Sequence, residues 1–285
     1  MASSTAPRVL RSWKPSHYMK FGSQRLRPAL DLLQLVHDLP SAANVMDLGC
    51  GPGNITPFIR FVAILSPCLD RIEYVHGNFE SFHSDIPVDV IYSNAALHWV
   101  SYNVHETLLP RLFNTLATTF PTVHLLARGL SAILYTTSYM NTMTSLLQQG
   151  GAFAFQMPDT RQQPSHVLMG EAANQLNLDV SNVRWVTTDV NADAYYKLLR
   201  PLTRDIHLWS TEYVYQLEAQ DNNIHPVVDY VSSTGLAPYV DALTPAQRPA
   251  FMDTYHELIA KAYPVQEDGR VLLPYKRFFC VAVQS

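Results

Sequence analysis

The chain has 285 residues, of which 47% are hydrophobic and 15% are charged. This length suffices for about one or two domains with a substantial core, and the composition excludes a disordered chain. With 20 Lys and Arg residues and 24 Asp and Glu residues, the formal net charge is −4. The sequence therefore offers no polycationic surface for nucleic acid or an anionic membrane, and it favours a small polar or anionic ligand.

The cysteines indicate a reducing compartment. Cys50, Cys68 and Cys280 are too few and too scattered for a disulfide framework or a zinc site, so no metal is expected. The N-terminus lacks the apolar region of a signal peptide, and the chain has no run of roughly 18 or more apolar residues. These observations predict a cytoplasmic protein without a membrane span.

Strands and helices alternate along the first half of the chain. In chain order, the residue patterns predict a helix over residues 28–37, a strand over 44–48, a helix over 55–64, strands over 71–76 and 88–93, a helix over 105–116 and a strand over 151–157. Such alternation is typical of a parallel, doubly wound α/β sheet, which binds ligands at the carboxyl ends of its strands.

The second half of the chain is mainly helical. Predicted helices cover residues 165–176, 192–199, 227–232 and 245–263, and predicted strands cover 206–217 and 271–283. We expect the helices to form a C-terminal cap and the two strands to lie at the edge of the sheet.

A glycine-rich turn joins the first predicted strand to the next helix. Gly49, Gly51 and Gly53 allow a sharp turn and a close approach to a ligand, and the helix N-terminus adds free N–H groups. A dinucleotide fingerprint would need glycine where Asn54 stands, and the Gly-Lys-Ser/Thr ending of a triphosphate loop is missing. Asp47, two residues before the first glycine, suits a cationic group such as an α-amino group or a sulfonium; it could also simply cap a turn.

The turn sequence VMDLGCGPGN (residues 45–54) resembles motif I of the class I S-adenosylmethionine-dependent methyltransferases. Further stretches narrow this resemblance to the trans-aconitate methyltransferase family. They include WKPSHYMKFGSQRLRPALDLL at 13–33, VDVIYSNAALHWV at 88–100, GGAFAFQMPDT at 150–160 and STGLAPY at 233–239. The resemblance implies a Rossmann-like sheet, S-adenosyl-L-methionine as cofactor, and methyl transfer to a carboxylate of a small tricarboxylic acid. The products would be a monomethyl ester and S-adenosylhomocysteine.

No catalytic base is expected for this reaction. A carboxylate with a pKa near ~4 is already ionised at neutral pH, so catalysis would come from in-line positioning and the exclusion of water. The other carboxylates of the acid would need cations and hydrogen-bond donors, and the guanidinium of arginine suits this role.

The candidate site residues follow from the glycine turn, the predicted strand ends and the resemblance. The predicted cofactor-binding residues are Asp47, Gly49, Cys50, Gly51, Gly53, Asn54, Asn78 and Asn94. The predicted substrate-binding residues are Trp13, Tyr18, Arg25, Arg27, His166, Trp209 and Arg277. For the basic residues an ordinary ion-paired surface role stays open, as does a core role for the aromatic ones. Ala237 stands where the family commonly has arginine, which leaves the acid open.

Two segments depart from the family pattern. Only 17 residues run from Asn54 to Asp70, too few for a helix, a second strand and another helix. The acidic residue that grips the ribose in such folds therefore has no firm candidate, although Asp70 and Glu73 lie at about the right separation. Conversely, residues 117–147 exceed a normal connection by about thirty residues. They are either a lid or membrane-touching element, or a segment never selected to fold, as if coding boundaries were misplaced.

We therefore expect three parts. Residues 1–40 form an N-terminal helical lid segment, residues 41–160 the cofactor-binding α/β core, and residues 161–285 the helical cap with the edge strands. The primary expectation is an active carboxyl methyltransferase of the trans-aconitate type. A methyltransferase-like protein with impaired cofactor binding and a methyltransferase for a different small acid remain alternatives, and the oligomeric state stays open.

Overall fold

The computed structural model describes residues 19–36, 44–63, 72, 74–79, 81–82, 87–116, 151–183, 191–219 and 224–284. The chain divides into two compact units. The sheet unit comprises residues 25–158, 189–211 and 277–285, and the cap unit comprises residues 1–24, 159–188 and 212–276. The predicted insert at 117–147 lies outside the described residues.

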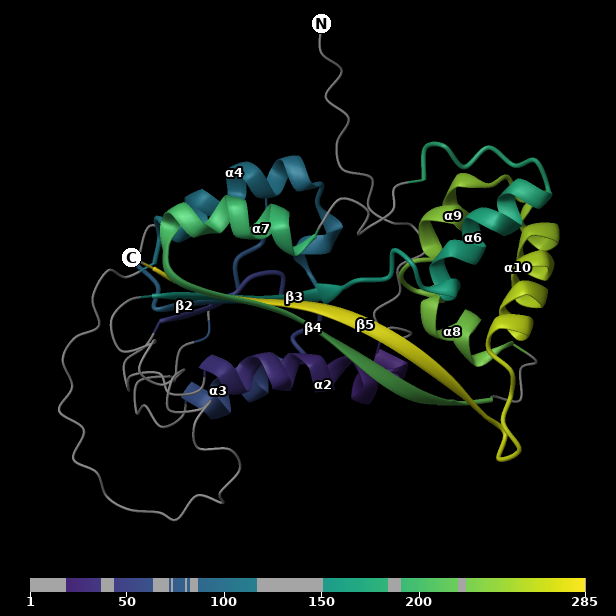
Figure 1. The fold of residues 1–285 in the computed structure, drawn as a ribbon, viewed down its shortest axis with the longest axis horizontal. Helices are drawn as coiled ribbons and strands as arrows, with labels where there is room; N and C mark the ends of the chain where they lie inside the picture. The colour runs from purple at the N-terminus through teal and green to yellow at the C-terminus, as the bar shows by residue number, and fades with distance from the viewer. Residues whose placement is uncertain are drawn as a thin grey trace, which may run out of the picture. The chain divides into compact units, whose positions relative to one another are not determined.

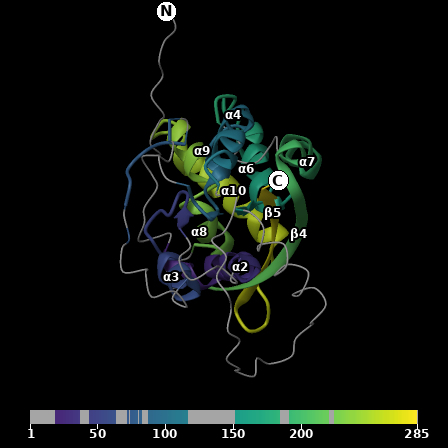
Figure 2. The same cartoon turned by 90° about the vertical axis from the view of Figure 1, so that its left-hand side faces the viewer.

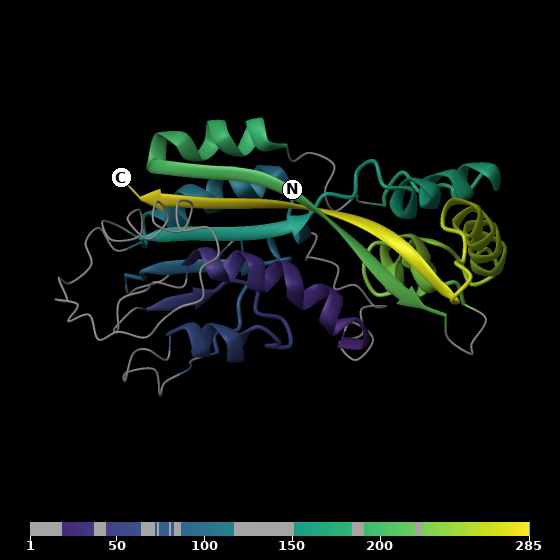
Figure 3. The same cartoon turned by 60° about the horizontal axis from the view of Figure 1, so that its bottom comes forward.

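Among the described residues, five strands form one sheet in the order β1-β2-β3-β5-β4. The strands are β1 (Val45–Asp47), β2 (Val90–Asn94), β3 (Ala152–Pro158), β4 (Thr203–Glu218) and β5 (Arg270–Gln284). β2 pairs in parallel with β1 and β3, and β5 runs antiparallel to β3. Figure 3 shows β4 and β5 side by side in opposite directions. The α/β prediction is confirmed, with a parallel half and an antiparallel edge.

Helices cover both faces of the sheet within the sheet unit, as a doubly wound fold requires. α2 (Gly22–Leu33) and α3 (Thr56–Ala63) lie on one face, and α4 (Tyr102–Phe113) and α7 (Ala192–Leu199) lie on the other (Figures 1 and 2). Short 3-10 helices occur at η1 (Gln34–Val36), η2 (Leu97–Trp99) and η3 (Arg200–Leu202).

The core of the sheet unit forms where the apolar side chains of β2 and β3 meet α4 and α7. Ile91, Phe153 and Phe155 are completely buried, together with Leu108 of α4 and Tyr195 of α7. These residues come from the predicted strands and helices, whose apolar positions therefore point inward as their spacing indicated.

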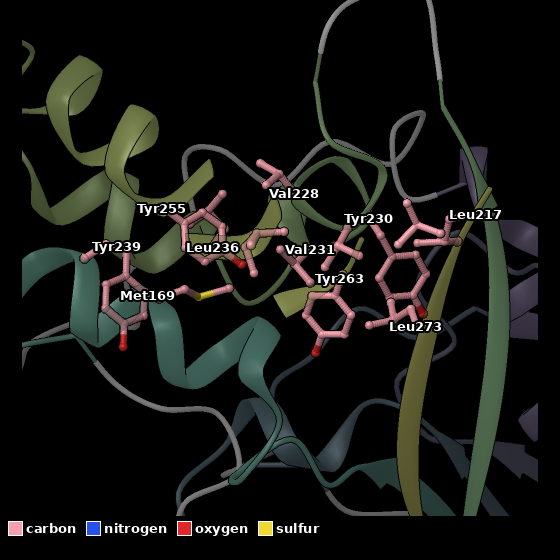
Figure 4. Packing of buried hydrophobic residues seen from close by; sticks show 14 of the residues in the cluster. Met169, Leu217, Val228, Tyr230, Val231, Leu236, Tyr239, Tyr255, Tyr263 and Leu273 are labelled. Carbon is pink, nitrogen blue, oxygen red and sulfur yellow. The ribbon is translucent and has the colours of Figure 1, made fainter. Parts of the chain in front are cut away.

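The cap unit has a separate core. Its helices are α6 (Pro164–Gln175), α8 (Pro226–Ser232), α9 (Ala237–Ala242) and α10 (Arg248–Ala262). Figure 4 shows Met169 of α6, Tyr239 of α9 and Tyr255 of α10 in this core. The sequence patterns missed the short α9. The helices predicted at 165–176, 227–232 and 245–263 form in the cap unit within a few residues of the expected bounds. The helix predicted at 192–199 also forms, as α7, but it belongs to the sheet unit and not to the cap, because its apolar side chains pack in the core of the sheet unit.

One predicted strand does not form. Ile72 and residues 74–76 have no regular structure, and Tyr74 and Val75 are 70% and 68% exposed. A strand must hydrogen-bond with the backbone of a neighbouring strand, and the edge strand β1 pairs with β2 but not with this segment among the described residues. The β-forming residues of this segment are therefore not sufficient for a strand.

No helix among the described residues is long and apolar enough to cross a membrane. The same residues contain no group of three or more His, Cys, Asp or Glu side chains that could hold a metal ion.

Candidate functional site

The glycine turn after β1 depends on backbone conformations that side chains rarely adopt. Gly49, Gly51 and Gly53 have φ angles of 81°, 56° and 78°. A Cβ atom on Gly49 would also overlap the Cβ of Ala96 and lie 3.2 Å from the ring of Phe79. Position 49 therefore needs glycine for two reasons, its positive φ angle and the close approach of two neighbouring side chains.

The same contacts bring the Asn78–Phe79 segment beside the glycine turn. The Phe79 carbonyl accepts a hydrogen bond from Arg111 Nη2 at 2.8 Å, which ties this segment to α4. The Oδ1 atom of Asn78 accepts from the backbone N–H and the hydroxyl of Ser81, both at 2.8 Å. Phe79 is the neighbour of Gly49, and Asn78 directly precedes Phe79 in the chain. Two predicted cofactor residues, Asn78 and Gly49, therefore belong to neighbouring segments.

Asp47 lies at the carboxyl end of β1, directly before the turn. Its Oδ2 atom is buried and has no hydrogen-bond partner among the described residues. Burial raises the pKa of Asp47 from 3.8 to about 6. Burial, followed by the charge of Asp47, also raises the pKa of the half-buried Cys50 thiol. A buried carboxylate without a partner costs free energy, which a cationic ligand group would recover.

The turn continues through two polar residues into α3. Asn54 is half-buried, and Thr56 begins the helix. The hydroxyl oxygen of Thr56 is buried without a hydrogen-bond partner among the described residues and would lie 3.5 Å from a Cβ on Gly53. This second unsatisfied polar atom borders the same turn.

Asn94 ends β2 and takes part in a hydrogen-bonded row across the sheet. Its Oδ1 atom accepts from Gln156 Nε2 of β3, and Gln156 Oε1 accepts from Arg277 Nη1 of β5 at 3.4 Å. Ala95, the next residue, has a φ of 48°, which is unusual for a residue with a side chain. The row places two predicted residues, Asn94 and Arg277, on one edge of the sheet unit.

The other predicted substrate residues of the sheet unit have different surroundings. Arg25 of α2 is 4% exposed, whereas Arg27 is solvent-facing and its Nε lies 2.8 Å from Asp31 Oδ1. Trp209 of β4 stacks on Phe279, with ring centroids 5.0 Å apart. Trp13 and Tyr18 lie outside the described residues.

His166 belongs to the cap unit, at the start of α6. Its Nδ1 lies 3.0 Å from the Ser165 hydroxyl, and a Cβ on Gly235 would come within 2.5 Å of its Nε2. Burial lowers the pKa of His166 to about 4, so the imidazole is neutral at pH 7. Ala237, also in the cap unit, is 1% exposed and begins α9.

Two polar features escaped the sequence reasoning. Gln156 is 1% exposed within an otherwise apolar strand, a break in the pattern that could have been noticed. In the cap unit, Asp159 accepts from Arg161 Nε at 2.8 Å and lies 3.4 Å from Lys276 Nζ. Burial would raise the pKa of Asp159, but its bonds with the two cations outweigh burial and lower that pKa.

The residues around the glycine turn fit a ligand with a cationic group. The turn offers open space at Gly51, where a Cβ would meet nothing within 4 Å, and the buried Oδ2 atom of Asp47 has no hydrogen-bond partner among the described residues. A sheet with a parallel half and an antiparallel edge, this glycine turn after its first strand, and helices on both faces are together typical of one class of enzymes. The protein is a class I S-adenosylmethionine-dependent methyltransferase.

The sequence is similar to curated methyltransferases over nearly its whole length. The trans-aconitate 2-methyltransferase of Paracidovorax citrulli is 35% identical and covers 97% of this chain and 100% of its own length. Those of Azoarcus sp. and Enterobacter sp. are 33% and 31% identical; both match 96% of this chain, over 99% and 98% of their own lengths. The chain belongs to the trans-aconitate methyltransferase family.

No protein-family profile matches the chain. A solved loganic acid methyltransferase with SAH is 11% identical, with a TM-score of 0.48 over 95% of this chain and 98% of that chain.

Proposed function

We propose that the protein transfers the methyl group of S-adenosylmethionine to a carboxylate of a small tricarboxylic acid of the trans-aconitate type. The observation that carries this proposal is the glycine turn beside the buried Asp47 Oδ2, which has no hydrogen-bond partner among the described residues, in a chain that matches trans-aconitate methyltransferases over nearly its whole length. The products are the monomethyl ester and S-adenosylhomocysteine.

The cofactor would bind along the turn. S-Adenosylmethionine, when bound, supplies an electrophilic methyl group on a sulfonium. Asp47 would accept a hydrogen bond from the cationic amino group, and the turn from Gly49 to Asn54 would offer backbone N–H groups without Cβ interference. We also assign Asn78 and Asn94 to this site, because Phe79 and Ala96 hold their segments against Gly49.

The acid substrate needs positioning rather than activation. Its attacking carboxylate is ionised at neutral pH, so this chain has to orient it and exclude water. We propose Arg25 and Arg277, both buried, as ligands for the other carboxylates. Trp13, Tyr18 and Trp209 stay proposed substrate-binding residues. Arg27 and His166 stay candidates; the neutral state of His166 favours hydrogen bonding over charge attraction.

The test separates cofactor binding from substrate choice. Calorimetric titration with S-adenosylmethionine is expected to show binding to the folded protein, and no heat at millimolar cofactor would refute an enzymatic function. An assay with labelled methyl donor across tricarboxylic and dicarboxylic acids then ranks the substrates. We expect a tricarboxylic acid to rank first, and Arg25→Ala to raise its KM; a dicarboxylic acid in first place would indicate a different substrate class.

A second candidate is a methyltransferase-like protein that binds the cofactor weakly. It is favoured by Ile72 and residues 74–76, which form no strand after α3. A cofactor affinity that does not respond to Asp47→Asn would support this candidate. We further propose a cytoplasmic location, because Cys50 and Cys280 are free thiols.

A further inference from the structure

A row of polar side chains crosses three adjacent strands of the sheet unit. Asn94 ends β2, Gln156 lies opposite it on β3, and Arg277 lies on β5 opposite Pro158. Gln156 and Arg277 are 1% and 4% exposed, so both are enclosed by the packed sheet. A buried amide is unfavourable unless its hydrogen bonds are satisfied. Gln156 satisfies them with the two neighbouring strands.

The chemistry of arginine fixes the direction of every bond in this row. A guanidinium only donates, so the Oε1 atom of Gln156 faces Arg277. The Nε2 atom of Gln156 therefore faces Asn94 and donates to its Oδ1. Asn94 is left with its Nδ2 group as a donor, and this group donates to no residue that the structure describes.

The free amide nitrogen belongs to a residue at the ligand-binding edge. Asn94 is half-buried at the carboxyl end of β2, two residues before Ala96, which packs against Gly49 of the turn. Parallel strands bind ligands at this edge. An N–H group there suits an oxygen that only accepts hydrogen bonds, such as a carboxylate oxygen.

We propose that Gln156, supported by Arg277, is a positioning residue that holds Asn94 as a hydrogen-bond donor to a carboxylate oxygen of a bound ligand. This inference rests on the proposed function. The cofactor and the acid substrate both carry carboxylates, so the carboxylate that Asn94 binds could belong to either of them. Separate measurements of the binding of each ligand distinguish the two.

Gln156→Glu tests the inference with almost no change in size. The new carboxylate still accepts from Arg277 but cannot donate to Asn94, whose amide then turns its nitrogen toward the carboxylate and its oxygen toward the ligand. We expect either the Kd of S-adenosylhomocysteine, measured by calorimetry, or the KM of the best acid at saturating cofactor to rise about tenfold or more. Because the new carboxylate also pairs with Arg277, the ligand is identified by the constant that rises in both Gln156→Glu and Asn94→Asp, and kcat changes less than that constant.

The matched control is Gln247→Glu in the cap unit. Gln247 Oε1 accepts from the backbone N–H and the hydroxyl of Thr244, at 3.0 and 2.8 Å, and a carboxylate can continue to accept both bonds. We expect this variant to keep both constants of the wild-type protein.

Asn94→Asp provides an independent test, since its side chain offers only acceptor oxygens. Asn94→Asp should weaken binding of the same ligand as Gln156→Glu does. The double variant should bind this ligand no more weakly than Asn94→Asp alone, because the two changes remove the same interaction. Asn174→Asp, exposed on α6, controls for the added charge. Additive losses, or a folded Gln156→Glu protein with both constants unchanged, would overturn the inference.

If the Gln156→Glu protein does not fold, the Asn94→Asp variant tests the inference by itself. An unchanged Kd of S-adenosylhomocysteine and an unchanged KM of the acid in Asn94→Asp would then overturn the inference. A wild-type protein that neither binds S-adenosylhomocysteine nor methylates any acid would instead refute the proposed function. The two failures are therefore distinguishable.

Discussion

The carboxylate of Asp47 dominates the electrostatics of the glycine turn. Its buried Oδ2 lacks a partner among the described residues, and burial raises its pKa to about 6. Since this value exceeds the ordinary 3.8, the folded protein binds the proton more tightly than the unfolded chain. Asp47 therefore adds a stability cost that is fully present above pH 6 and absent below pH 3.8.

A cationic ligand group should reverse this cost, so cofactor affinity should depend on pH. We expect the affinity for S-adenosylmethionine to be constant well above pH 6 and to fall by up to about tenfold per unit below it, because the ligand must displace the proton. Calorimetry between pH 5 and pH 8 measures this, with proton release visible in buffers of different ionisation enthalpy. Asp47→Asn should bind weakly and without this pH dependence; an unchanged profile would contradict the assignment.

Gly49 and Gly51 should differ in their tolerance of a side chain. Gly49→Ala combines an unfavourable φ with overlap against Ala96, so we expect a loss of about 2–5 kcal/mol in the free energy of unfolding. Gly51→Ala has the φ strain alone and should lose about 1 kcal/mol. Gly77→Ala, in open space and without a positive φ, is the control and should be near neutral. Urea unfolding ranks the three variants by their free energy of unfolding. Equal losses of this free energy in Gly49→Ala and Gly51→Ala would argue against the overlap with Ala96.

At the scale of elements, prolines and buried tyrosines define the cap unit. Pro164, Pro226, Pro238 and Pro249 each stand in the first turn of a helix, where the missing N–H costs nothing and the fixed φ suits the helix. The start of α6 is then held from two sides. Ser165 donates its backbone N–H to the Tyr263 hydroxyl at 3.0 Å, and its carbonyl accepts from the Tyr255 hydroxyl at 2.6 Å.

Tyr255→Phe should therefore lower the free energy of unfolding more than the removal of a hydroxyl from an exposed tyrosine does. Tyr255 is completely buried, so the change leaves the Ser165 carbonyl without that donor, at a cost of about 1–3 kcal/mol. Tyr196→Phe on α7 is the control, because that side chain is 48% exposed. Thermal unfolding compares the two, and an equally small shift in both would show that the buried bond contributes little.

At the scale of the whole molecule, the sheet unit and the cap unit each have a core of their own. All the proposed cofactor residues belong to the sheet unit, while His166 and Ala237 belong to the cap unit. Within the cap unit, Lys20 pairs with the buried Asp229 and Phe21 packs edge-on against Tyr230.

Cofactor binding should consequently stabilise the protein through the sheet unit. At a concentration about 100 times its Kd, S-adenosylmethionine should raise the free energy of unfolding by about 2.7 kcal/mol. Hydrogen exchange is expected to show new protection in residues 45–56 and 88–99, with α10 changing least. The Asp47→Asn protein should lack both effects at the same concentration, and protection confined to α10 would place the ligand elsewhere.

The sequence by itself determined the features that depend on neighbouring residues. The positive φ angles at Gly49, Gly51 and Gly53 follow from a turn that only glycine makes easily, and the helices and most strands follow from apolar spacing. The family resemblance rests on the same local motifs. The strand expected at 71–76 failed because pairing requires a second strand, which local composition does not encode.

Only the tertiary structure decided which side chains meet. The bonds of Gln156 with Asn94 and Arg277 depend on the register of three strands that are far apart in sequence. The raised pKa of Asp47 and the lowered pKa of His166 likewise arise from burial by distant segments. Spacing along a chain can nominate polar residues for a site, but their charge state and hydrogen-bond direction are set by three-dimensional neighbours.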